Sequence, residues 1–347
     1  MNMNGPRILV IKLSSLGDVL HSLPTLTAIR RAHPRAYIAW VVGPKAAEIV
    51  TRHPGVDRVY GLGVVGEQTA NFHPLPSTRD AMPVLRAERF DISLDMQGLF
   101  RTAVLAFRIG ARQRVGFRGF QEGAFLLCNR RVIPCREDIH AIHGYLQFAR
   151  YLGADDSIVD FGLVEEPDDK AWAENLLGVA APIQSGRTLK GAATPPIAAI
   201  APAASRTEKR WSADGFAQTA AALRSAGARV VVVGSSADAP IAARICSASG
   251  AEDLTGQTTL PQLAALLRRC QLFIGNDSGP LHLAAAVGTP CLSLFGPTLP
   301  LRTGPFGNHV VLVGHGISWA EKIAPDQVIK TAEAILAGSR SIPTQAQ

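Results

Sequence analysis

Residues 8–26, ILVIKLSSLGDVLHSLPTL, contain the unit from which the whole chain is built. The apolar run from Arg7 to Ile11 predicts a buried strand, and a short polar loop follows it. Apolar residues then recur at helical spacing from Val19 to Ala32. A strand, a loop and a helix in this order form the repeating unit of a parallel sheet, so the segment predicts an α/β fold.

The same unit recurs along the rest of the chain. In the first half, Tyr37–Val42 and Ile92–Asp95 predict strands, followed by helices at 44–51 and 98–110. The second half predicts strands at Ile197–Ala201, Val230–Val233, Leu272–Gly275 and Cys291–Leu294, with helices near 212–226, 240–248, 261–269 and 279–287. We expect mainly parallel sheets covered on both faces, with ligands bound beyond the carboxyl ends of the strands.

The length of 347 residues favours two domains over one. The alternation weakens between residues 153 and 196, where an acidic stretch and a helix lead into the segment APIQSGRTLKGAATPP. We therefore expect two doubly wound, Rossmann-like domains that face a central cleft. The first would cover residues 1–165 and the second residues 197–347, with a linker region at 166–196.

The net charge of +7 is concentrated in one segment. Residues 101–136 contain eight arginines and a single acid, Glu122. Such a segment is typical of surfaces that bind phosphate, carboxylate or an anionic membrane, although a solvated face has the same composition. The arginines are Arg101, Arg108, Arg112, Arg114, Arg118, Arg130, Arg131 and Arg136.

Composition and motifs argue against several classes of protein. Five cysteines without a C-x-x-C pair fit neither a disulfide framework nor a zinc site. There is no D-x-D metal clamp and no G-x-S-x-G nucleophile elbow. The first residues do not resemble a secretion signal, and no segment approaches the roughly 20 apolar residues that span a bilayer. We expect a cytoplasmic protein with no metal and no other cofactor.

The loop after the first strand contains Ser14, Gly17 and Asp18. Asp18 falls near the start of the helix, where a carboxylate commonly caps free backbone N–H groups. The loop also lies at the carboxyl end of the strand, where a carboxylate can accept a proton from a substrate hydroxyl. The residues alone leave both roles open.

A second candidate site follows the strand Leu272–Gly275, in the segment NDSGPLHL. Proline in the first turn of a helix, beside unpaired N–H groups, is typical of an anion site. Lys209 follows a neighbouring strand and brings a positive charge to the same sheet edge. Asp277 and Ser278 also suit helix capping, and His282 also suits a buried core position.

On these residues the chain resembles the family 9 glycosyltransferases, whose best-known members are ADP-heptose:lipopolysaccharide heptosyltransferases. ILVIKLSSLGDVLHSLPTL is similar to the family's first strand and catalytic loop, especially in heptosyltransferase I, which adds the first heptose. DMQGLFRTA and CNRRV are similar to two further segments of the family. KRW, LTGQTTL and NDSGPLHLAAAVGTP are closer to enzymes that add a later heptose, so the choice of acceptor stays open.

The resemblance runs nearly end to end and implies the GT-B architecture. It implies transfer of heptose from ADP-heptose to the inner core of lipopolysaccharide, with a Kdo-lipid A type acceptor. The transfer would invert the anomeric centre and require no metal. Asp18 would be the general base. The donor-binding residues implied are Ser205, Lys209, Asp238, Asp277, Ser278, Gly279 and His282, and the acceptor-binding residues are Lys12, Ser14, Arg101, Arg130 and Arg131.

The resemblance also implies the partners of the chain. These are an ADP-sugar donor and an anionic, lipid-linked saccharide acceptor, and no nucleic acid is expected. The protein would be a monomer that contacts the cytoplasmic face of the inner membrane. Two alternatives remain: a family member with another sugar or acceptor, and a non-catalytic protein that binds nucleotide sugars. Asp18 in its Gly-Asp loop favours an enzyme.

Overall fold

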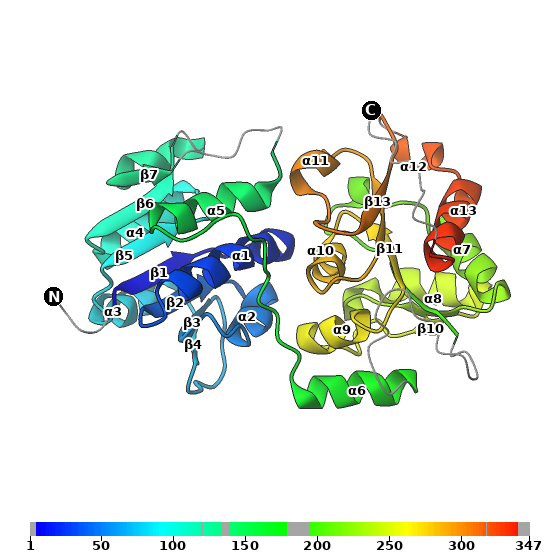
Figure 1. Cartoon of the computed structure of the whole chain (residues 1–347), viewed down its shortest axis with the longest axis horizontal. Coiled ribbons are helices and arrows are strands. Elements are labelled where there is room, and N and C mark those ends of the chain that lie inside the picture. The colour runs from blue at the N-terminus through cyan, green and yellow to red at the C-terminus, as the bar shows by residue number, and fades with distance from the viewer. Residues whose placement is uncertain (1–4, 119–120, 133–138, 179–194, 317, 339–347) are drawn as a thin grey trace. The chain divides into compact units, whose positions relative to one another are not determined.

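The computed structural model describes residues 5–118, 121–132, 139–178, 195–316 and 318–338. The chain divides into two compact units, Met1–Val164 and Glu165–Gln347, each built from one sheet and its helices (Figure 1). Arg136 of the arginine-rich segment and residues 179–194 of the expected linker lie outside the described residues.

The first unit contains a seven-stranded sheet in the order β4-β3-β2-β1-β5-β6-β7. Its strands are β1 (Arg7–Ile11), β2 (Tyr37–Val42), β3 (Arg58–Leu62), β4 (Phe72–Leu75), β5 (Ile92–Asp95), β6 (Gln113–Phe117) and β7 (Arg130–Val132). Its α-helices are α1 (Leu16–Ala32), α2 (Pro44–Thr51), α3 (Thr78–Ala87), α4 (Phe100–Ile109) and α5 (Ala141–Tyr151), and a 3₁₀ segment, η1 (Gln121–Leu127), follows β6.

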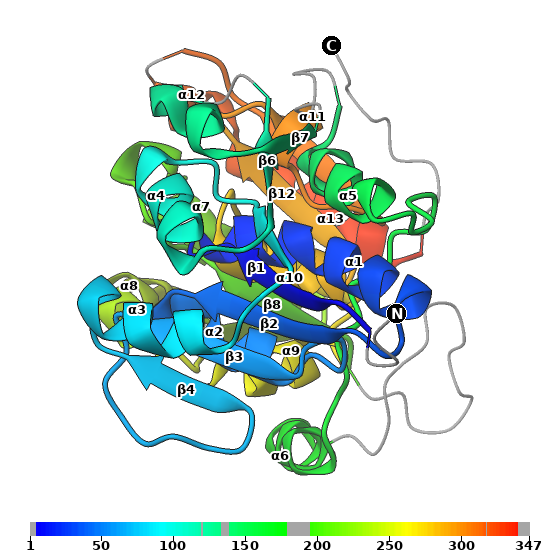
Figure 2. The same cartoon turned by 90° about the vertical axis from the view of Figure 1, so that its left-hand side faces the viewer.

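The two faces of the central strand β1 are covered by different helices. Leu9 and Ile11 pack in one hydrophobic cluster with Leu85 of α3 and with residues of α4. Ile8 and Val10 alternate onto the other face and are also fully buried. Figure 2 shows α1 and α5 on the opposite side of the sheet from α3 and α4. An apolar strand of this kind needs cover on both sides, which the sequence predicted.

The second unit contains a six-stranded sheet in the order β10-β9-β8-β11-β12-β13. Its strands are β8 (Ile197–Ala201), β9 (Arg229–Val232), β10 (Glu252–Asp253), β11 (Leu272–Asn276), β12 (Cys291–Phe295) and β13 (His309–Val313). Its helices are α6 (Pro167–Leu177), α7 (Ala213–Ser225), α8 (Ala239–Ser249), α9 (Leu260–Leu267), α10 (Gly279–Ala286), α11 (Pro300–Thr303), α12 (Trp319–Lys322) and α13 (Pro325–Leu336), with 3₁₀ turns η2 (Thr207–Lys209) and η3 (Ser236–Asp238).

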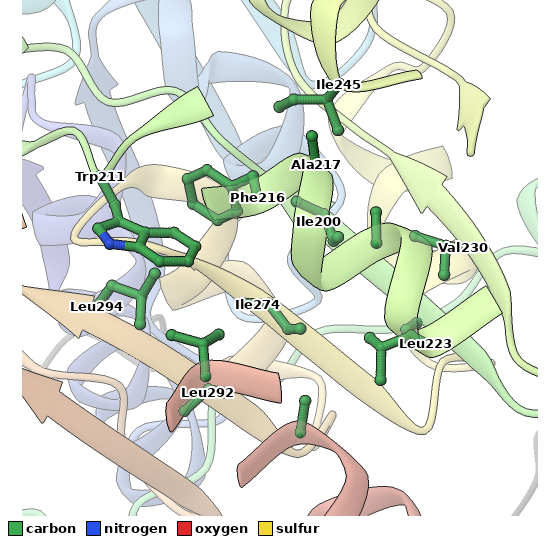
Figure 3. Packing of buried hydrophobic residues seen from close by; sticks show 14 of the residues in the cluster. Ile200, Trp211, Phe216, Ala217, Leu223, Val230, Ile245, Ile274, Leu292 and Leu294 are labelled. Atoms are coloured by element: carbon green, nitrogen blue, oxygen red, sulfur yellow. The ribbon is translucent and has the colours of Figure 1, made fainter. Parts of the chain in front are cut away.

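The core of the second unit forms where α7 lies over the sheet. Figure 3 shows Phe216 and Leu223 of α7 packed in one cluster with Ile200, Ile274 and Leu292 of three neighbouring strands. Each of these side chains is fully buried, and burial of one such side chain stabilises the fold by about 1.5–3 kcal/mol. This packing holds the strands whose carboxyl ends lead into the loops that contain Lys209, Asp277 and Thr298.

A buried ion-pair cluster joins the first residues of the second unit to the segment that follows α9. Arg269, just beyond α9, is fully buried and places Nη1 2.5 Å from Glu165 and Nη2 3.0 Å from Glu174. Glu174 lies on α6, which packs against α9. Part of the segment expected as a linker therefore forms a helix that is docked on the second unit.

Every strand and helix predicted from the sequence is present, with ends shifted by a few residues, and the α/β fold class is confirmed. All described strand pairs in both sheets are parallel. The outer strands of the first sheet were not predicted, because proline in β4 and arginines in β6 and β7 interrupt the apolar pattern. Among the described helices, none has the length and apolar composition to cross a membrane.

Candidate functional site

Two loops are joined at the carboxyl edge of the first sheet. Ile11, at the end of β1, pairs in register with Asp95, at the end of β5. The side-chain oxygen of Gln97 accepts hydrogen bonds from the backbone N–H groups of Leu13 (3.0 Å) and Ser14 (3.1 Å). This one amide therefore fixes the loop that leads from β1 into α1.

Asp18 lies in the first turn of α1 and is half-buried. Its Oδ2 accepts hydrogen bonds from the Ser15 backbone N–H (3.1 Å) and from the Ser15 hydroxyl (2.7 Å). Its Oδ1 accepts a hydrogen bond from the hydroxyl of Tyr145 on α5, 3.3 Å away. Asp18 therefore caps the helix with one oxygen and is held from a second helix through the other.

In two other serine–aspartate pairs, the serine hydroxyl likewise donates to the aspartate three residues later. At the start of α3, the Ser77 hydroxyl donates to Oδ2 of Asp80 over 2.6 Å. At η3, the Ser235 hydroxyl donates to Oδ2 of Asp238 over 2.7 Å. Of the three aspartates, all in described parts of the chain, only Asp18 is also held on Oδ1 by a side chain of another helix. Capping alone therefore does not account for the surroundings of Asp18.

A buried positive charge lies close to this carboxylate. Lys12 follows β1, is only 3% exposed, and places its Nζ 5.1 Å from the ring centroid of Tyr145. Burial lowers the pKa of Lys12, while the negative charges of Asp18 and Asp95 act in the opposite direction. The lysine therefore depends on neighbouring acidic groups to keep its charge.

Asp95 is enclosed at the end of β5. Its Oδ1 accepts hydrogen bonds from the backbone N–H groups of Gln97 (3.2 Å) and Gly98 (3.1 Å), and its Oδ2 accepts one from the Thr102 hydroxyl (3.1 Å). Burial nevertheless raises the pKa of Asp95 to about 6, although these hydrogen bonds and Lys12 lower it. Asp95 therefore gains its negative charge as the pH approaches neutrality.

The arginine-rich segment does not form a single surface. Arg101 lies in the first turn of α4, at the carboxyl edge of the sheet, whereas Arg108 lies in the last turn, toward the opposite edge. Arg130 and Arg131 are consecutive residues of the edge strand β7, so their side chains point to opposite faces of the sheet. The Arg131 guanidinium lies 5.5 Å from the ring centroid of Phe125.

In the second unit, three loops meet at Asp277. Lys209, in the loop after β8, places its Nζ 2.5 Å from Oδ2 of Asp277, and both side chains are largely buried. Thr298, in the loop after β12, donates its hydroxyl to the same oxygen over 2.8 Å. His282 of α10 lies 3.3 Å from Oδ1 through its Nε2. The structure therefore brings Lys209, Asp277 and His282 together at one sheet edge.

Opposing effects set the charge of Asp277. Burial raises the pKa of a carboxyl group, but the hydrogen bonds and charges of His282 and Lys209 outweigh it and hold the pKa of Asp277 well below its ordinary value. The carboxylate is ionised at neutral pH, and Lys209 serves as its counter-ion.

Ser278 is the N-cap residue of α10, but its side chain makes no capping hydrogen bond. Its hydroxyl oxygen is buried and has no hydrogen-bond partner among the residues that the structure describes. Capping is therefore the wrong interpretation of this side chain. A buried hydroxyl beside the unpaired N–H groups of a helix N-terminus provides donors for an anion.

Asn276, fully buried at the end of β11, is hydrogen-bonded to the loop that follows β8. Its Oδ1 accepts a hydrogen bond from the backbone N–H of Trp211 (2.9 Å), and its Nδ2 donates to the carbonyl oxygen of Pro202 (2.7 Å). Both partners belong to the loop that contains Lys209. The amide therefore keeps that lysine within reach of Asp277.

The other predicted donor residues lie on the same edge. Ser205 is exposed in the loop after β8, Gly279 begins α10, and Asp238 follows β9 with its Oδ2 occupied by Ser235. Their contacts with a donor remain predictions. Within the described ranges, no group of three or more His, Cys, Asp or Glu side chains is arranged to hold a metal ion.

Sequence reasoning missed three residues of these two edges. Gln97 and Thr298 follow the ends of predicted strands by two and four residues, so the rule that singled out Asp18 applies to them as well. Tyr145 lies in the middle of a helix, 127 residues from Asp18, and no local pattern marks it. Only the packing of α5 on α1 brings it to the site.

The raised pKa of Asp95 predicts how stability depends on pH. Between the unfolded pKa near 3.8 and the folded pKa of about 6, the folded chain keeps a proton that the unfolded chain has lost, so stability falls as pH rises. Asp95→Asn removes this dependence. The free energy of unfolding of the variant, minus that of the wild type, should therefore increase by about 2 kcal/mol between pH 4 and pH 7.

Urea unfolding of both proteins at several pH values measures this difference. Subtracting the wild type removes the contribution of the other carboxylates, which is common to both proteins. A difference that stays constant from pH 4 to pH 7 would show that Asp95 has an ordinary pKa.

Comparison with known proteins identifies relatives of this chain in sequence and in fold. The family model described as glycosyltransferase family 9 (heptosyltransferase) matches residues 81–331. Lipopolysaccharide heptosyltransferase 1 of Pseudomonas aeruginosa is 30% identical over 89% of this chain and 83% of its own length. A glycosyl transferase family 9 structure from Veillonella parvula superposes with a TM-score of 0.79 at 24% identity, over 98% of this chain and 99% of that one.

The E. coli heptosyltransferase WaaC, solved with ADP, superposes with a TM-score of 0.73 at 23% identity, over 97% of this chain and all of that one. The matched family model covers more than half of the chain, and the curated relative is matched over most of its length. With its GT-B fold and its matched sequence, the chain belongs to glycosyltransferase family 9.

Proposed function

We propose that this protein transfers heptose from ADP-heptose to the inner core of lipopolysaccharide, onto a Kdo-lipid A type acceptor. Membership of the family supports a glycosyl transfer, and the Pseudomonas relative is named as a lipopolysaccharide heptosyltransferase. The observation that carries the proposal is Asp18, a carboxylate held on both oxygens at the carboxyl edge of the first sheet. A protein that only binds a nucleotide sugar does not need such a group.

Asp18 is the proposed general base. The acceptor hydroxyl gives its proton to the carboxylate as its oxygen attacks the anomeric carbon of the donor. The bond from that carbon to the diphosphate breaks, and ADP leaves with the electron pair. A single attack from the face opposite the leaving group inverts the anomeric centre.

The edge around Asp277 is the proposed donor site. The diphosphate gains negative charge as its bond to the anomeric carbon breaks. This charge is stabilised by Lys209, the Ser278 hydroxyl and the first N–H groups of α10. These donors supply stabilisation that a metal provides in other transferases, so we propose a transfer that needs no metal. Ser205, Asp238, Gly279 and His282 complete the proposed contacts with ADP-heptose.

The first unit is the proposed acceptor site. Lys12, Ser14 and Arg101 lie at its carboxyl edge, and Arg130 and Arg131 lie on β7. We propose that these residues bind the acidic groups of a lipid-linked saccharide. We propose peripheral contact with the cytoplasmic face of the inner membrane, to which Phe100 and Phe107 on α4, 47% and 52% exposed, would add apolar contacts. We propose that the protein works there as a monomer and binds no nucleic acid.

Asp18→Asn tests the proposed base. Loss of general-base catalysis lowers kcat by about 10²–10⁴-fold, while ADP affinity and the melting temperature stay close to those of the wild type. Asp80→Asn is the matched control, because Asp80 also accepts a serine hydroxyl in the first turn of a helix, α3. Release of ADP from ADP-heptose in the presence of acceptor measures kcat. Equal activities of the two variants would contradict the assignment.

Lys209→Ala tests the donor site. Removal of a charge-assisted contact with the diphosphate should weaken ADP binding about tenfold or more in calorimetric titration. Lys170→Ala on α6 removes an exposed lysine of the same unit and should leave ADP affinity unchanged. The wild type should keep full activity in excess chelator. An unchanged affinity in Lys209→Ala would rule out the proposed pyrophosphate contact.

Arg101→Ala tests the acceptor site. The KM for the acceptor should rise about threefold to fivefold, with little change in ADP affinity, and the effect should shrink at high salt. Arg108→Ala, at the other end of the same helix, serves as the control. If both variants raise KM equally, the arginines act through general charge and not through a site at the carboxyl edge.

A further inference from the structure

Helix α5 brings one aromatic side chain to the proposed catalytic edge. The helix packs along α1, as the view in Figure 2 also shows. Ile142, Leu146 and Ala149 of α5 are fully buried, so the packing fixes the position and rotation of the helix. Tyr145 on this helix is 8% exposed.

Tyr145 contacts two residues of the proposed site through different parts of its side chain. Its hydroxyl donates to Oδ1 of Asp18 over 3.3 Å, and the face of its ring lies 5.1 Å from Nζ of Lys12. The ring also packs against Phe117 at the end of β6, with a centroid distance of 6.2 Å. The tyrosine is therefore held by the core on one side and faces two charges on the other.

The two contacts have separate physical effects. A hydroxyl that donates to a carboxylate limits rotation of that group, and here it complements the Ser15 cap on the opposite oxygen. A ring face attracts a cation, which suits a buried ammonium that has lost most of its water. The hydroxyl thus acts on Asp18 and the ring on Lys12.

From this geometry we infer that Tyr145 is a positioning residue, which aims the Asp18 carboxylate through its hydroxyl and holds the Lys12 ammonium under its ring. The inference rests on the proposed function, in which Asp18 takes the acceptor proton and Lys12 faces the acidic acceptor. Each carboxylate oxygen has more than one acceptor position, so the bond to Tyr145 leaves Oδ1 able to receive a proton.

Tyr145→Phe separates the two effects, because it removes the hydroxyl and keeps the ring. We expect kcat to fall about threefold to tenfold, since the hydrogen bond that aims the base is lost. The KM for the acceptor and the affinity for ADP should not change. Tyr145→Leu removes the ring as well, so the KM for the acceptor should also rise.

Tyr151→Phe is the matched control. Tyr151 lies on the same helix and donates its hydroxyl to Gln113 over 2.9 Å, away from Asp18. The same substitution there also removes a tyrosine hydroxyl and its hydrogen bond, and it should leave kcat unchanged. Melting temperatures of both Phe variants should stay within about 2 °C of each other. A fall in kcat that accompanies a loss of stability in both variants would overturn the inference.

A double variant separates failure of this inference from failure of the proposed function. If Tyr145 acts through Asp18, then Tyr145→Phe should cause no further loss of kcat in the Asp18→Asn background. A further loss there, or a wild-type kcat in Tyr145→Phe alone, would overturn the role of Tyr145 and leave Asp18 as the base. A wild-type kcat in Asp18→Asn would instead overturn the proposed function, and the inference with it.

Discussion

Parallel pairing of the strands is the constraint on which both units depend. Each parallel strand must be reached by a crossover, so the chain returns to the same edge before every strand, and each helix after a strand begins at the carboxyl edge. Free N–H groups of helix N-termini and loop side chains therefore collect at this edge. Asp18 at the start of α1 and Ser278 at the start of α10 owe their positions to this constraint.

The two edges are stabilised in the same way. In each unit an amide side chain at or just beyond a central strand binds the backbone of the loop that follows the neighbouring strand. Gln97 binds two N–H groups after β1, and Asn276 binds one N–H and one carbonyl after β8. An amide can do this because it carries both donors and an acceptor without a charge. The loops are thereby held firmly before any ligand arrives.

The sequence predicted the central strands because their apolar runs are uninterrupted, and it predicted the candidate sites because they follow those strands. It did not predict Tyr145, because contacts between helices depend on packing across the whole unit. It also suggested one arginine surface, yet α4 separates Arg101 from Arg108, and β7 turns Arg130 and Arg131 to opposite faces. Arginines that are close in the sequence therefore do not form one charged surface when helices and strands separate their side chains.

Lys209 and Asp277 form an ion pair, so Asp277 competes with any incoming anion for the charge of Lys209. Before any ligand binds, the lysine already has a carboxylate 2.5 Å away, and Thr298 also donates to that carboxylate. An incoming anion must share or take over the lysine, and a singly charged anion gains little from this exchange. A diphosphate in the proposed donor site would bring more charge and would reach the helix N-terminus at the same time. If this edge is the donor site, as proposed, the pair would favour multiply charged ligands over small singly charged anions.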